Sequence, residues 1–230
     1  MIISMQKVYS LSERIRHFIN KKILPTTKFQ NSEKYWEDRY RTGGTSGTGS
    51  YNLLAEFKAE VVNQFITEHD INTVIEMGCG DGNQLKYFKI RSYIGFDISP
   101  TIIRHCNRLY GKDKSKQFRL MQQWEPSEIA ECSLSLDVIY HLIEDSVFND
   151  YMRKLFYSSR KYVIIYSTNS DVHENNGVAD HVKHRKFTDW VKSRMPEFKL
   201  IKVLPNKYPF NGDSLASTYA DFYFYAKTDN

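Results

Sequence analysis

A glycine-rich turn that follows an apolar segment is the strongest chemical signal in the sequence. Residues 76–84 read Glu-Met-Gly-Cys-Gly-Asp-Gly-Asn-Gln, and the run Thr73–Met77 that leads into them has the composition of a buried strand. Glycine lets the chain turn tightly and lets a ligand approach the backbone, while a short helix expected at residues 83–89 offers N–H groups at its N-terminus. The turn therefore predicts a binding site at the end of a strand.

The spacing of the glycines argues against a nicotinamide dinucleotide as the ligand. A dinucleotide fingerprint reads GxGxxG and needs its third glycine at residue 83, which is Asn here, so the spacing is GxGxG. Glu76, an acidic residue two positions before the first glycine, weakens that interpretation further.

A carboxylate follows the turn at the distance that a ribose requires. Asp97 ends a second apolar segment, residues 93–96, and lies 19 positions after Gly78, where a carboxylate can accept both hydroxyls of a ribose. Alternatively, Asp97 only caps the helix that starts at Pro100, although Ser99 can fill that role. Together the two signals favour a ribose-containing ligand.

Three stretches of the chain resemble the class I S-adenosylmethionine-dependent methyltransferases. VIEMGCGDGNQL, YIGFDIS and SLDVIYHLIED are similar to the first, second and fourth motifs of that family, and the order of elements matches over residues 50–227. The resemblance implies an α/β, Rossmann-like fold: a seven-stranded, mostly parallel sheet of order 3-2-1-4-5-7-6, with strand seven antiparallel and helices on both faces. It also implies S-adenosyl-L-methionine as cofactor and S-adenosyl-L-homocysteine as product.

The same resemblance implies which residues bind the cofactor. In the family the glycine turn holds the methionine part, the acid after strand two binds the ribose, and the loop after strand three contacts adenine. The family often has an acid in that third loop, where this chain has two glutamines. The residues carried over are Glu76, Gly78, Cys79, Gly80, Gly82, Gln84, Asp97, Ile98, Gln122, Gln123, Trp124 and Asp137.

A second glycine-rich stretch, residues 43–50, precedes the first core helix. Its sequence, GGTSGTGS, is typical of a flexible linker, but aromatic and charged residues flank it on one side and an amphipathic helix on the other. We therefore expect a loop that covers the cofactor. The residues expected to contact the cofactor from this side are Tyr35, Trp36, Arg39, Gly44 and Ser46.

A narrower resemblance concerns the methyl acceptor. YWEDRYRTGGTSGTGSYNLLAEFKAE together with SLDVIYHLIEDSVFNDYM is similar to a group of small bacterial methyltransferases found with surface-polysaccharide genes, including capsule O-methyl phosphoramidate pathways. This implies an acceptor oxygen in a phosphoramidate, a phosphate or a sugar precursor of capsule biosynthesis.

His141 is the candidate general base. An unperturbed imidazole pKa of ~6.5 suits proton acceptance at neutral pH, and His141 follows the fourth strand, where an acceptor should bind. The alternative is a structural histidine bonded to the backbone. The residues near Asp137 lack the (D/N/S)PP(Y/F) stretch of amino-methylating DNA enzymes, and that loop holds no cysteine for carbon-5 methylation of cytosine.

Further polar residues after the fourth and fifth strands are candidates for binding the acceptor. Residues 180–186, rich in His, Lys and Arg, are suited to hold an anion such as phosphate, or else begin a solvated helix. The spacings of His141, Asp145, His173 and His181 match no metal-ligand pattern, so no metal is expected. The candidate acceptor-binding residues are Tyr140, Asp145, Ser167, Asn169, His181 and Arg185.

Short apolar strands alternate with helices from residue 72 onward, which predicts a parallel sheet ending in an antiparallel hairpin. Residues 1–49 are expected to form a helical extension with the covering loop, and residues 50–230 a methyltransferase domain. The expected strands are 73–77, 93–96, 118–121, 134–140, 162–166, 199–204 and 218–226, and the expected helices are 51–68, 83–89, 100–110, 146–158 and 186–195.

Composition and charge limit the classes of partner. The 230 residues are 41% hydrophobic and carry a net charge of +5, but the first 41 hold nine Lys and Arg against four Asp and Glu, so the remainder is balanced. A neutral body disfavours a nucleic-acid partner. Three widely spaced cysteines, no signal peptide and no membrane span predict a cytoplasmic protein.

Two matters stay open from the sequence. Apolar residues at helical spacing between Leu11 and Ile23 suit a helix that lies on a membrane surface, on a second subunit or on its own domain. The alternatives to a small-molecule enzyme are a protein or RNA methyltransferase and a catalytically silent partner subunit.

Overall fold

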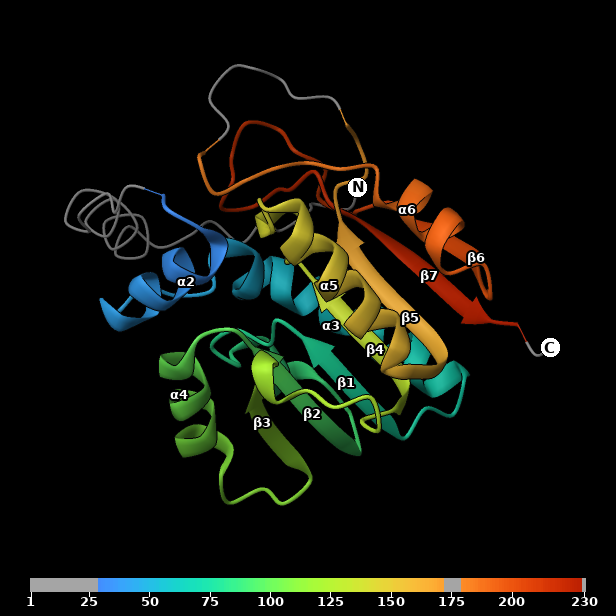
Figure 1. Cartoon of the computed structure of the whole chain (residues 1–230), viewed down its shortest axis with the longest axis horizontal. Helices are drawn as coiled ribbons and strands as arrows, with labels where there is room; N and C mark the ends of the chain where they lie inside the picture. Colours follow the sequence, from blue (N-terminus) through green and yellow to red (C-terminus); the bar gives the residue numbers. More distant parts are fainter. Residues whose placement is uncertain (1–28, 172–178, 229–230) are drawn as a thin grey trace, which may run out of the picture.

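Seven strands form one sheet in the part of the chain that the structure, a computed structural model, describes, which is residues 29–171 and 179–228. Their order is β3-β2-β1-β4-β5-β7-β6 (Figure 1). The strands are β1 (Thr73–Met77), β2 (Ser92–Asp97), β3 (Lys116–Leu120), β4 (Ala130–Leu136), β5 (Ser159–Ser167), β6 (Phe198–Leu204) and β7 (Asp221–Lys227).

The pairing confirms the predicted fold class. Strands β1 to β5 pair in parallel, and β7 pairs antiparallel with both β5 and β6. Glu76 of β1 lies opposite Gly95 of β2 and Leu134 of β4. Because parallel strands point the same way, the residues that follow β1, β2, β3 and β4 meet at one edge of the sheet.

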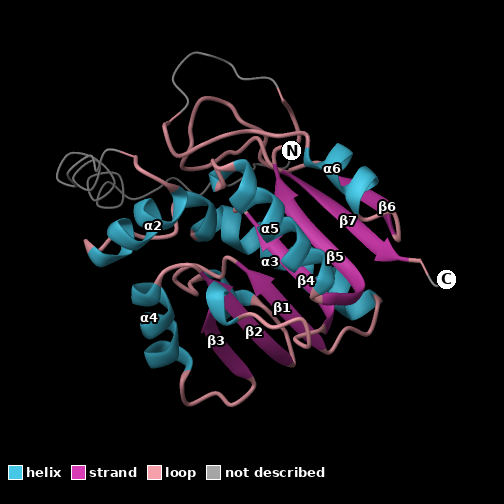
Figure 2. Ribbon diagram, viewed as in Figure 1, coloured by secondary structure: helices cyan, strands magenta, loops and turns pink. Residues whose placement is uncertain are grey.

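Helices cover both faces of this sheet (Figure 2). One hydrophobic cluster joins Phe65 of α3 (Asn52–Glu68) and Ile103 of α4 (Pro100–Tyr110) to the strands, and a second joins Met152 of α5 (Asp145–Tyr157) and Val191 of α6 (Phe187–Arg194) to the opposite face. Every residue of β4 is buried, as expected for a central strand covered on both sides.

The fourth strand ends earlier than its sequence predicts. We expected residues 134–140 to be extended, but β4 runs from Ala130 to Leu136 and a 3-10 helix, η4 (Ile139–His141), follows. Asp137 has φ +62°, a left-handed conformation that Asp tolerates better than most residues, and the Tyr140 hydroxyl donates to its carboxylate at 2.8 Å. This local turn outweighs the strand propensity of Val138, Ile139 and Tyr140.

Helix α2 (Ser32–Arg41) lies before the core, in the part of the chain predicted as a helical extension, and its bounds were not predicted. The side chain of Asn31 accepts from the backbone N–H of Lys34 at 2.7 Å and caps its N-terminus. The predicted short helix near residue 84 is a 3-10 turn, η2 (Gln84–Tyr87), and the 3-10 turn η1 (Thr48–Ser50) interrupts the glycine-rich loop.

Two further findings concern the described residues only. No helix among them combines the length and apolar character needed to cross a bilayer. The amphipathic segment between Leu11 and Ile23, and with it most of the predicted N-terminal extension, lies outside the described residues.

Candidate functional site

The edge at which β1, β2, β3 and β4 end contains a cavity of about 580 Å³, within the size range of small-molecule sites. Its floor consists of the glycine turn after β1 and the ends of β2 and β4, and its walls come from α2 and α5. The lining includes Trp36, Tyr40, Ser46, Glu76, Gly78, Cys79, Gly80, Gln84, Asp97, Ile98, Met121, Gln122, Asp137, His141 and Glu144.

The glycine turn passes close to the ends of the neighbouring strands. The backbone N–H groups of Gly78 and Cys79 both donate to the carbonyl of Phe96, at 2.7 and 2.9 Å. Gly78 has φ +79°, and a Cβ there would lie 2.5 Å from Val138. A side chain at this position is therefore excluded both by backbone conformation and by space.

Asp97 is buried beside the turn with both carboxylate oxygens bonded to backbone. Gly80 N–H donates to Oδ2 and Ser99 N–H to Oδ1, each at 3.0 Å. Burial raises the pKa of Asp97 to about 6, although these backbone donors oppose the shift. The carboxylate is thus fixed in direction at the cavity wall.

Glu76 lies just before the glycine turn, in β1, and Gln84 lies just after it, at the start of η2. The Tyr93 hydroxyl donates to Glu76, and burial raises the pKa of this carboxyl to about 7. The side-chain nitrogen of Gln84 is buried and has no hydrogen-bond partner among the described residues. A buried amide without a partner is costly, so this donor is suited to meet an acceptor on a ligand.

The glycine-rich loop packs directly against this turn. Ser46 N–H donates to the carboxylate of Asp81 at 2.9 Å, and Asp81 N–H donates to Ser46 Oγ at 2.8 Å. Arg39 of α2 binds the loop, because its Nε donates to the carbonyl of Thr45 at 2.6 Å. The loop of residues 43–50 is therefore bonded to helix α2 on one side and to the glycine turn on the other.

His141 lies at the end of η4 with its ring against Trp36, at 4.9 Å between ring centroids. Its Nδ1 lies 3.1 Å from the carbonyl of His181, which fixes Nδ1 as the donor and leaves a lone pair on Nε2. Burial lowers the pKa of His141 to about 4. The imidazole is therefore neutral at pH 7, and its basicity is lower than the unperturbed value assumed from the sequence.

Solved structures similar to this chain are methyltransferases. The N-methyltransferase NodS from Bradyrhizobium japonicum WM9, in complex with S-adenosyl-l-homocysteine, superposes with a TM-score of 0.67 at 9% identity, over 87% of this chain and 100% of NodS. Magnesium protoporphyrin IX methyltransferase (ChlM) from Synechocystis PCC 6803, with bound SAM, gives 0.61 at 14% identity, over 88% of this chain and 100% of ChlM. This chain has the class I SAM-dependent methyltransferase fold.

A third structure with this methyltransferase fold is the methyltransferase domain of bacterial CtHen1, with a TM-score of 0.58 and 16% identity over 77% of this chain and 100% of that domain. At the level of sequence, no protein-family model and no curated protein matches the chain. These similarities thus concern the architecture alone.

Several residues predicted to contact the cofactor support the cavity without lining it. Tyr110 donates to the carbonyl of Gly82 at 2.7 Å, Gln123 accepts from Leu120 N–H at 3.0 Å, and Trp124 donates to Ser158 at 2.7 Å. On the α2 side, the ring of Tyr35 stacks on His181 at 4.3 Å, and a Cβ at Gly44 would lie 2.7 Å from the carbonyl of Arg39. The residues outside the lining are Tyr35, Arg39, Gly44, Gly82, Gln123 and Trp124.

The six predicted acceptor-binding residues also lie outside the lining. Asn169 accepts from Thr188 at the start of α6, and Ser167 is buried at the end of β5. Asp145 pairs with both Lys183 and Arg185 at 2.7 Å, so it neutralises much of the basic run that we expected to hold an anion. The remaining two, Tyr140 and His181, contact Asp137 and His141 respectively.

Lys58 is a residue of the site that sequence reasoning missed. Its side chain is fully buried in α3, pairs with Asp137 and lies 5.4 Å from the centre of the Tyr166 ring. A signal was present, because Lys58 lies four residues after Leu54 and four before Val62, on the apolar stripe of an amphipathic helix. A lysine on such a stripe needs a buried partner.

The lining of the cavity is strongly acidic. Among the described residues it holds one lysine, Lys154, which pairs with Asp150 at 2.8 Å. No group of three or more His, Cys, Asp or Glu in residues 29–171 and 179–228 has the geometry to hold a metal ion. The acidic lining residues are Glu33, Glu76, Asp81, Asp97, Asp137, Glu144 and Asp150.

Proposed function

We propose that this chain is a SAM-dependent methyltransferase that acts on a small polar acceptor. The observation that carries the proposal is the placement of Asp97, whose carboxylate is buried at the end of β2, held by Gly80 and exposed to the cavity. A carboxylate oxygen keeps further lone pairs after accepting one backbone bond. Ribose hydroxyls that donate to it would bind beside the glycine turn.

The residues of the cavity fit the other groups of the cofactor. Its sulfonium and ammonium are cations, which suit a lining of seven carboxyl side chains and one lysine. The carboxylate of the cofactor needs a hydrogen-bond donor in this acidic cavity, and the buried amide nitrogen of Gln84 is a neutral donor that can meet it. Ile98 and Met121 supply apolar surface for a purine.

The cofactor supplies an electrophilic methyl group on a good leaving group, so catalysis by the protein consists mainly of alignment. A hydroxyl acceptor also has to lose a proton. His141 lines the cavity, is neutral at pH 7 and keeps a lone pair on Nε2 that can accept that proton, and its lowered pKa makes it a weaker base than a free imidazole. We assign His141 this role as part of the proposal.

For the acceptor we propose an oxygen of a small hydroxylated molecule, such as a sugar precursor of a surface polysaccharide. The phosphoramidate or phosphate acceptor implied by the narrower resemblance has less support, because Arg185 and Lys183 are paired with Asp145 and lie outside the lining. An anion would also meet the carboxylates of the cavity.

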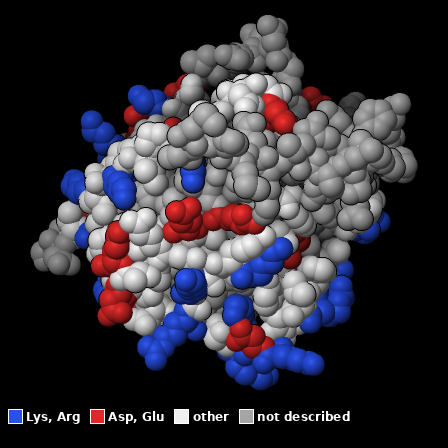
Figure 3. Space-filling view, turned by 180° about the vertical axis from the view of Figure 1, so that it is seen from behind, with Lys and Arg blue, Asp and Glu red and all other residues white. Residues whose placement is uncertain are grey.

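The alternative of an RNA substrate receives no support from the face of the molecule that Figure 3 shows. On the face shown in Figure 3, Lys and Arg side chains are interspersed with acidic ones and form no continuous basic stripe. An RNA-binding groove requires such a stripe. A cytoplasmic location agrees with the proposed acceptor and stays part of the proposal.

Two measurements test the function. Titration calorimetry with S-adenosylhomocysteine should give a defined one-site isotherm, and a methyl-transfer assay should compare uncharged sugars, nucleotide-sugars, a phosphoramidate, a peptide and tRNA. We expect turnover at a sugar hydroxyl, with uncharged sugars preferred because the diphosphate of a nucleotide-sugar would meet the carboxylates of the cavity. Binding of the cofactor product without turnover of any acceptor would favour the silent-partner alternative, and no binding would refute the proposal.

A further inference from the structure

The turn that carries His141 ends with backbone carbonyls that the turn itself cannot satisfy. The 3-10 helix η4 ends at His141, and Leu142 and Ile143 then lead into the first turn of α5. The carbonyls at the end of a helix need partners from outside it. These carbonyls lie within a few residues of the imidazole, so whatever binds them also determines where the ring is held.

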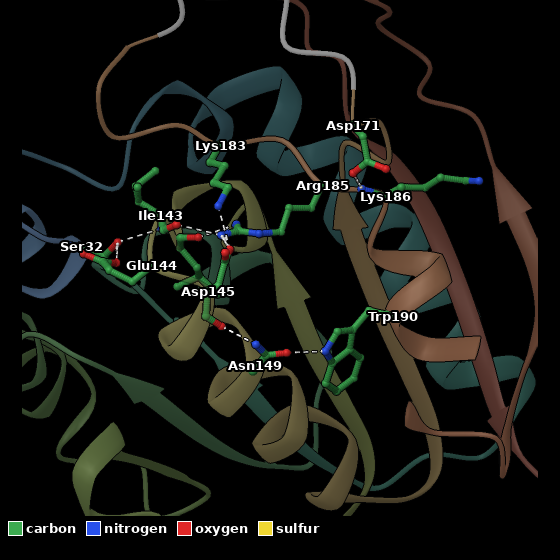
Figure 4. Close-up of polar contacts among 11 residues, drawn as sticks. Ser32, Ile143, Glu144, Asp145, Asn149, Asp171, Lys183, Arg185, Lys186 and Trp190 are labelled. Carbon is green, nitrogen blue, oxygen red and sulfur yellow. Dashed lines mark hydrogen bonds and ion pairs between the residues drawn. The ribbon is translucent and has the colours of Figure 1, made fainter. Parts of the chain in front are cut away.

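Arg185 binds both carbonyls. Its Nη1 donates to the carbonyl of Leu142 at 2.5 Å, and its Nη2 donates to the carbonyl of Ile143 at 2.8 Å and to Asp145 at 2.7 Å (Figure 4). The guanidinium also lies 4.6 Å from the centre of the Phe148 ring, and its side chain is 11% exposed. Since guanidinium presents several donors in a fixed plane, one side chain can bridge three acceptors.

The rest of the segment around Arg185 follows the same turn. The backbone N–H of Lys183 donates to the carbonyl of Tyr140 at 2.8 Å, and the carbonyl of His181 lies 3.1 Å from Nδ1 of His141. His181 thus contacts His141, and Lys183 contacts Tyr140. Arg185 contacts Leu142 and Ile143. The contact that fixes the tautomer of His141 therefore belongs to the same segment that Arg185 anchors.

The turn is also tied to α2 on its other side. The backbone N–H of Ile143 donates to Ser32 Oγ at 3.1 Å, and Ser32 donates to Glu144 from its hydroxyl at 2.7 Å and from its N–H at 3.0 Å (Figure 4). Arg185 and Ser32 consequently bind opposite ends of the Ile143 residue. This arrangement leaves the turn little freedom to shift relative to the cavity.

We propose that Arg185 is a positioning residue for His141, which holds the turn and the tautomer of the imidazole, and that it does not bind the acceptor. The inference rests on the proposed methyl transfer, because it names a residue that acts through the proposed base. Its guanidinium is committed to protein acceptors, and the ring that it positions lines the cavity.

Nitrogen-detected NMR of the imidazoles tests this without a known acceptor, with the His141 signals assigned by His141→Gln. In the wild type we expect one tautomer, protonated at Nδ1. In Arg185→Met we expect both nitrogens to report a mixture of tautomers, whereas S-adenosylhomocysteine affinity stays within about twofold because Arg185 does not line the cavity. In the same variant, turnover of the acceptor identified by the methyl-transfer assay should fall at least about tenfold, and KM for the cofactor should stay unchanged.

Lys186→Met is the matched control, because Lys186 is a neighbouring cation whose side chain is half-exposed and pairs with Asp189. It should leave the tautomer and turnover unchanged. Arg185→Lys, which retains the charge but reaches fewer acceptors, should give an intermediate tautomer signal. If Arg185→Met does not fold, Arg185→Lys decides the question.

An unchanged His141 tautomer in a folded Arg185 variant would overturn the proposal. So would specific binding of inorganic phosphate to the wild type that is lost in Arg185→Lys, since this would make Arg185 an anion site. If the wild type binds no S-adenosylhomocysteine, it is the proposed function that fails, and the tautomer measurement still reports separately on the turn.

Discussion

The hydroxyl of Ser99 donates to the carboxylate of Glu37 and so ties α2, which forms one wall of the cavity, to the strand end that carries Asp97. The backbone N–H of the same Ser99 donates to Asp97 at 3.0 Å. Glu37 also accepts from Thr101 N–H at 3.2 Å and from Thr101 Oγ1 at 2.6 Å, at the N-terminus of α4, where the helix dipole favours a negative charge. One carboxylate therefore holds the wall and the ribose-binding corner together.

Loss of this link should weaken cofactor binding although Glu37 does not line the cavity. We expect Glu37→Ala to reduce the affinity for S-adenosylhomocysteine by about 1 to 2 kcal/mol, because charge-assisted hydrogen bonds are lost and α2 is released. Calorimetry measures the affinity. Lys34→Ala, which removes the ion pair between a half-exposed lysine and Asp38 on the same helix, is the control and should bind normally. Equal affinities in both variants would show that α2 does not depend on Glu37.

The elements that could be predicted from the sequence are those whose ends are marked locally. Strand β1 and helix α4 begin and end where predicted, because a β-branched run precedes the glycine turn and because Ser99 and Pro100 mark the start of α4. The end of β4 was wrong because it depends on the left-handed conformation of Asp137, which composition does not reveal. The bounds of helix α2 were not predicted within the expected helical extension, because its sequence is mostly polar.

Asp97→Ala should weaken binding of S-adenosylhomocysteine by about 2 kcal/mol or more, since it removes charge-assisted contacts to two hydroxyls. The wild-type affinity should also fall as the pH drops below about 6, the pKa of Asp97, because only the ionised carboxylate accepts from both hydroxyls. Calorimetry from pH 5 to 8 measures both effects. Gln123→Ala, on a side chain outside the lining, should bind as the wild type does.

Glu76 should make the folded protein less stable as the pH rises. Burial raises its pKa from 4.5 to about 7, so between these values the folded protein holds a proton that the unfolded chain has released. The contribution of the protonated carboxyl to the free energy of unfolding is complete below pH 4.5, the pKa in the unfolded chain. It is lost as the pH rises through about 7, the pKa in the folded protein. Urea unfolding of Glu76→Gln should therefore show a gain of about 1 to 3 kcal/mol over the wild type at pH 8 and little gain near pH 4.5. A constant difference across this range would contradict the assignment.

Lys58 should be essential for stability through its pairing with Asp137. Removal of one partner of a buried ion pair leaves an uncompensated charge and typically costs about 3 to 5 kcal/mol, whereas removal of both is much less costly. We therefore expect Lys58→Met to unfold at much lower denaturant concentrations and Lys58→Met/Asp137→Asn to recover most of the loss. Asn suits the position because it tolerates a positive φ. Chemical denaturation of the two single variants and the double variant gives the coupling free energy, and additive effects would argue against a paired role.

The parts of the site that the sequence did not reveal are those that depend on partners distant in the chain. Arg185 was interpreted as an anion ligand from its neighbours in sequence, but its acceptors are residues 142, 143 and 145, about 40 positions earlier. The partner of Lys58 is 79 positions away. Motif spacing could place Glu76, Gly78 and Asp97 in one cavity because they lie at the ends of two neighbouring strands of the same sheet, and no comparable rule relates a loop cation to a turn before α5.

The turnover of His141 variants should distinguish the two possible roles of His141, and the pH dependence of the wild type tests its lowered pKa. Because burial lowers its pKa to about 4, the imidazole stays neutral from pH 6 to 9, and kcat should be flat over this range rather than rise with a midpoint near 6.5. If the acceptor is a hydroxyl, His141→Ala should reduce turnover by ~10² to 10⁴, since the proposed base is lost, and affinity for S-adenosylhomocysteine should change much less. If the acceptor is an ionised phosphoryl oxygen, no base is needed, and His141→Ala should act on KM for the acceptor.

His141→Gln, which keeps a donor toward the carbonyl of His181 but has no comparable basicity, separates loss of the base from loss of packing. Full activity in this variant with a hydroxyl acceptor would remove His141 from proton transfer.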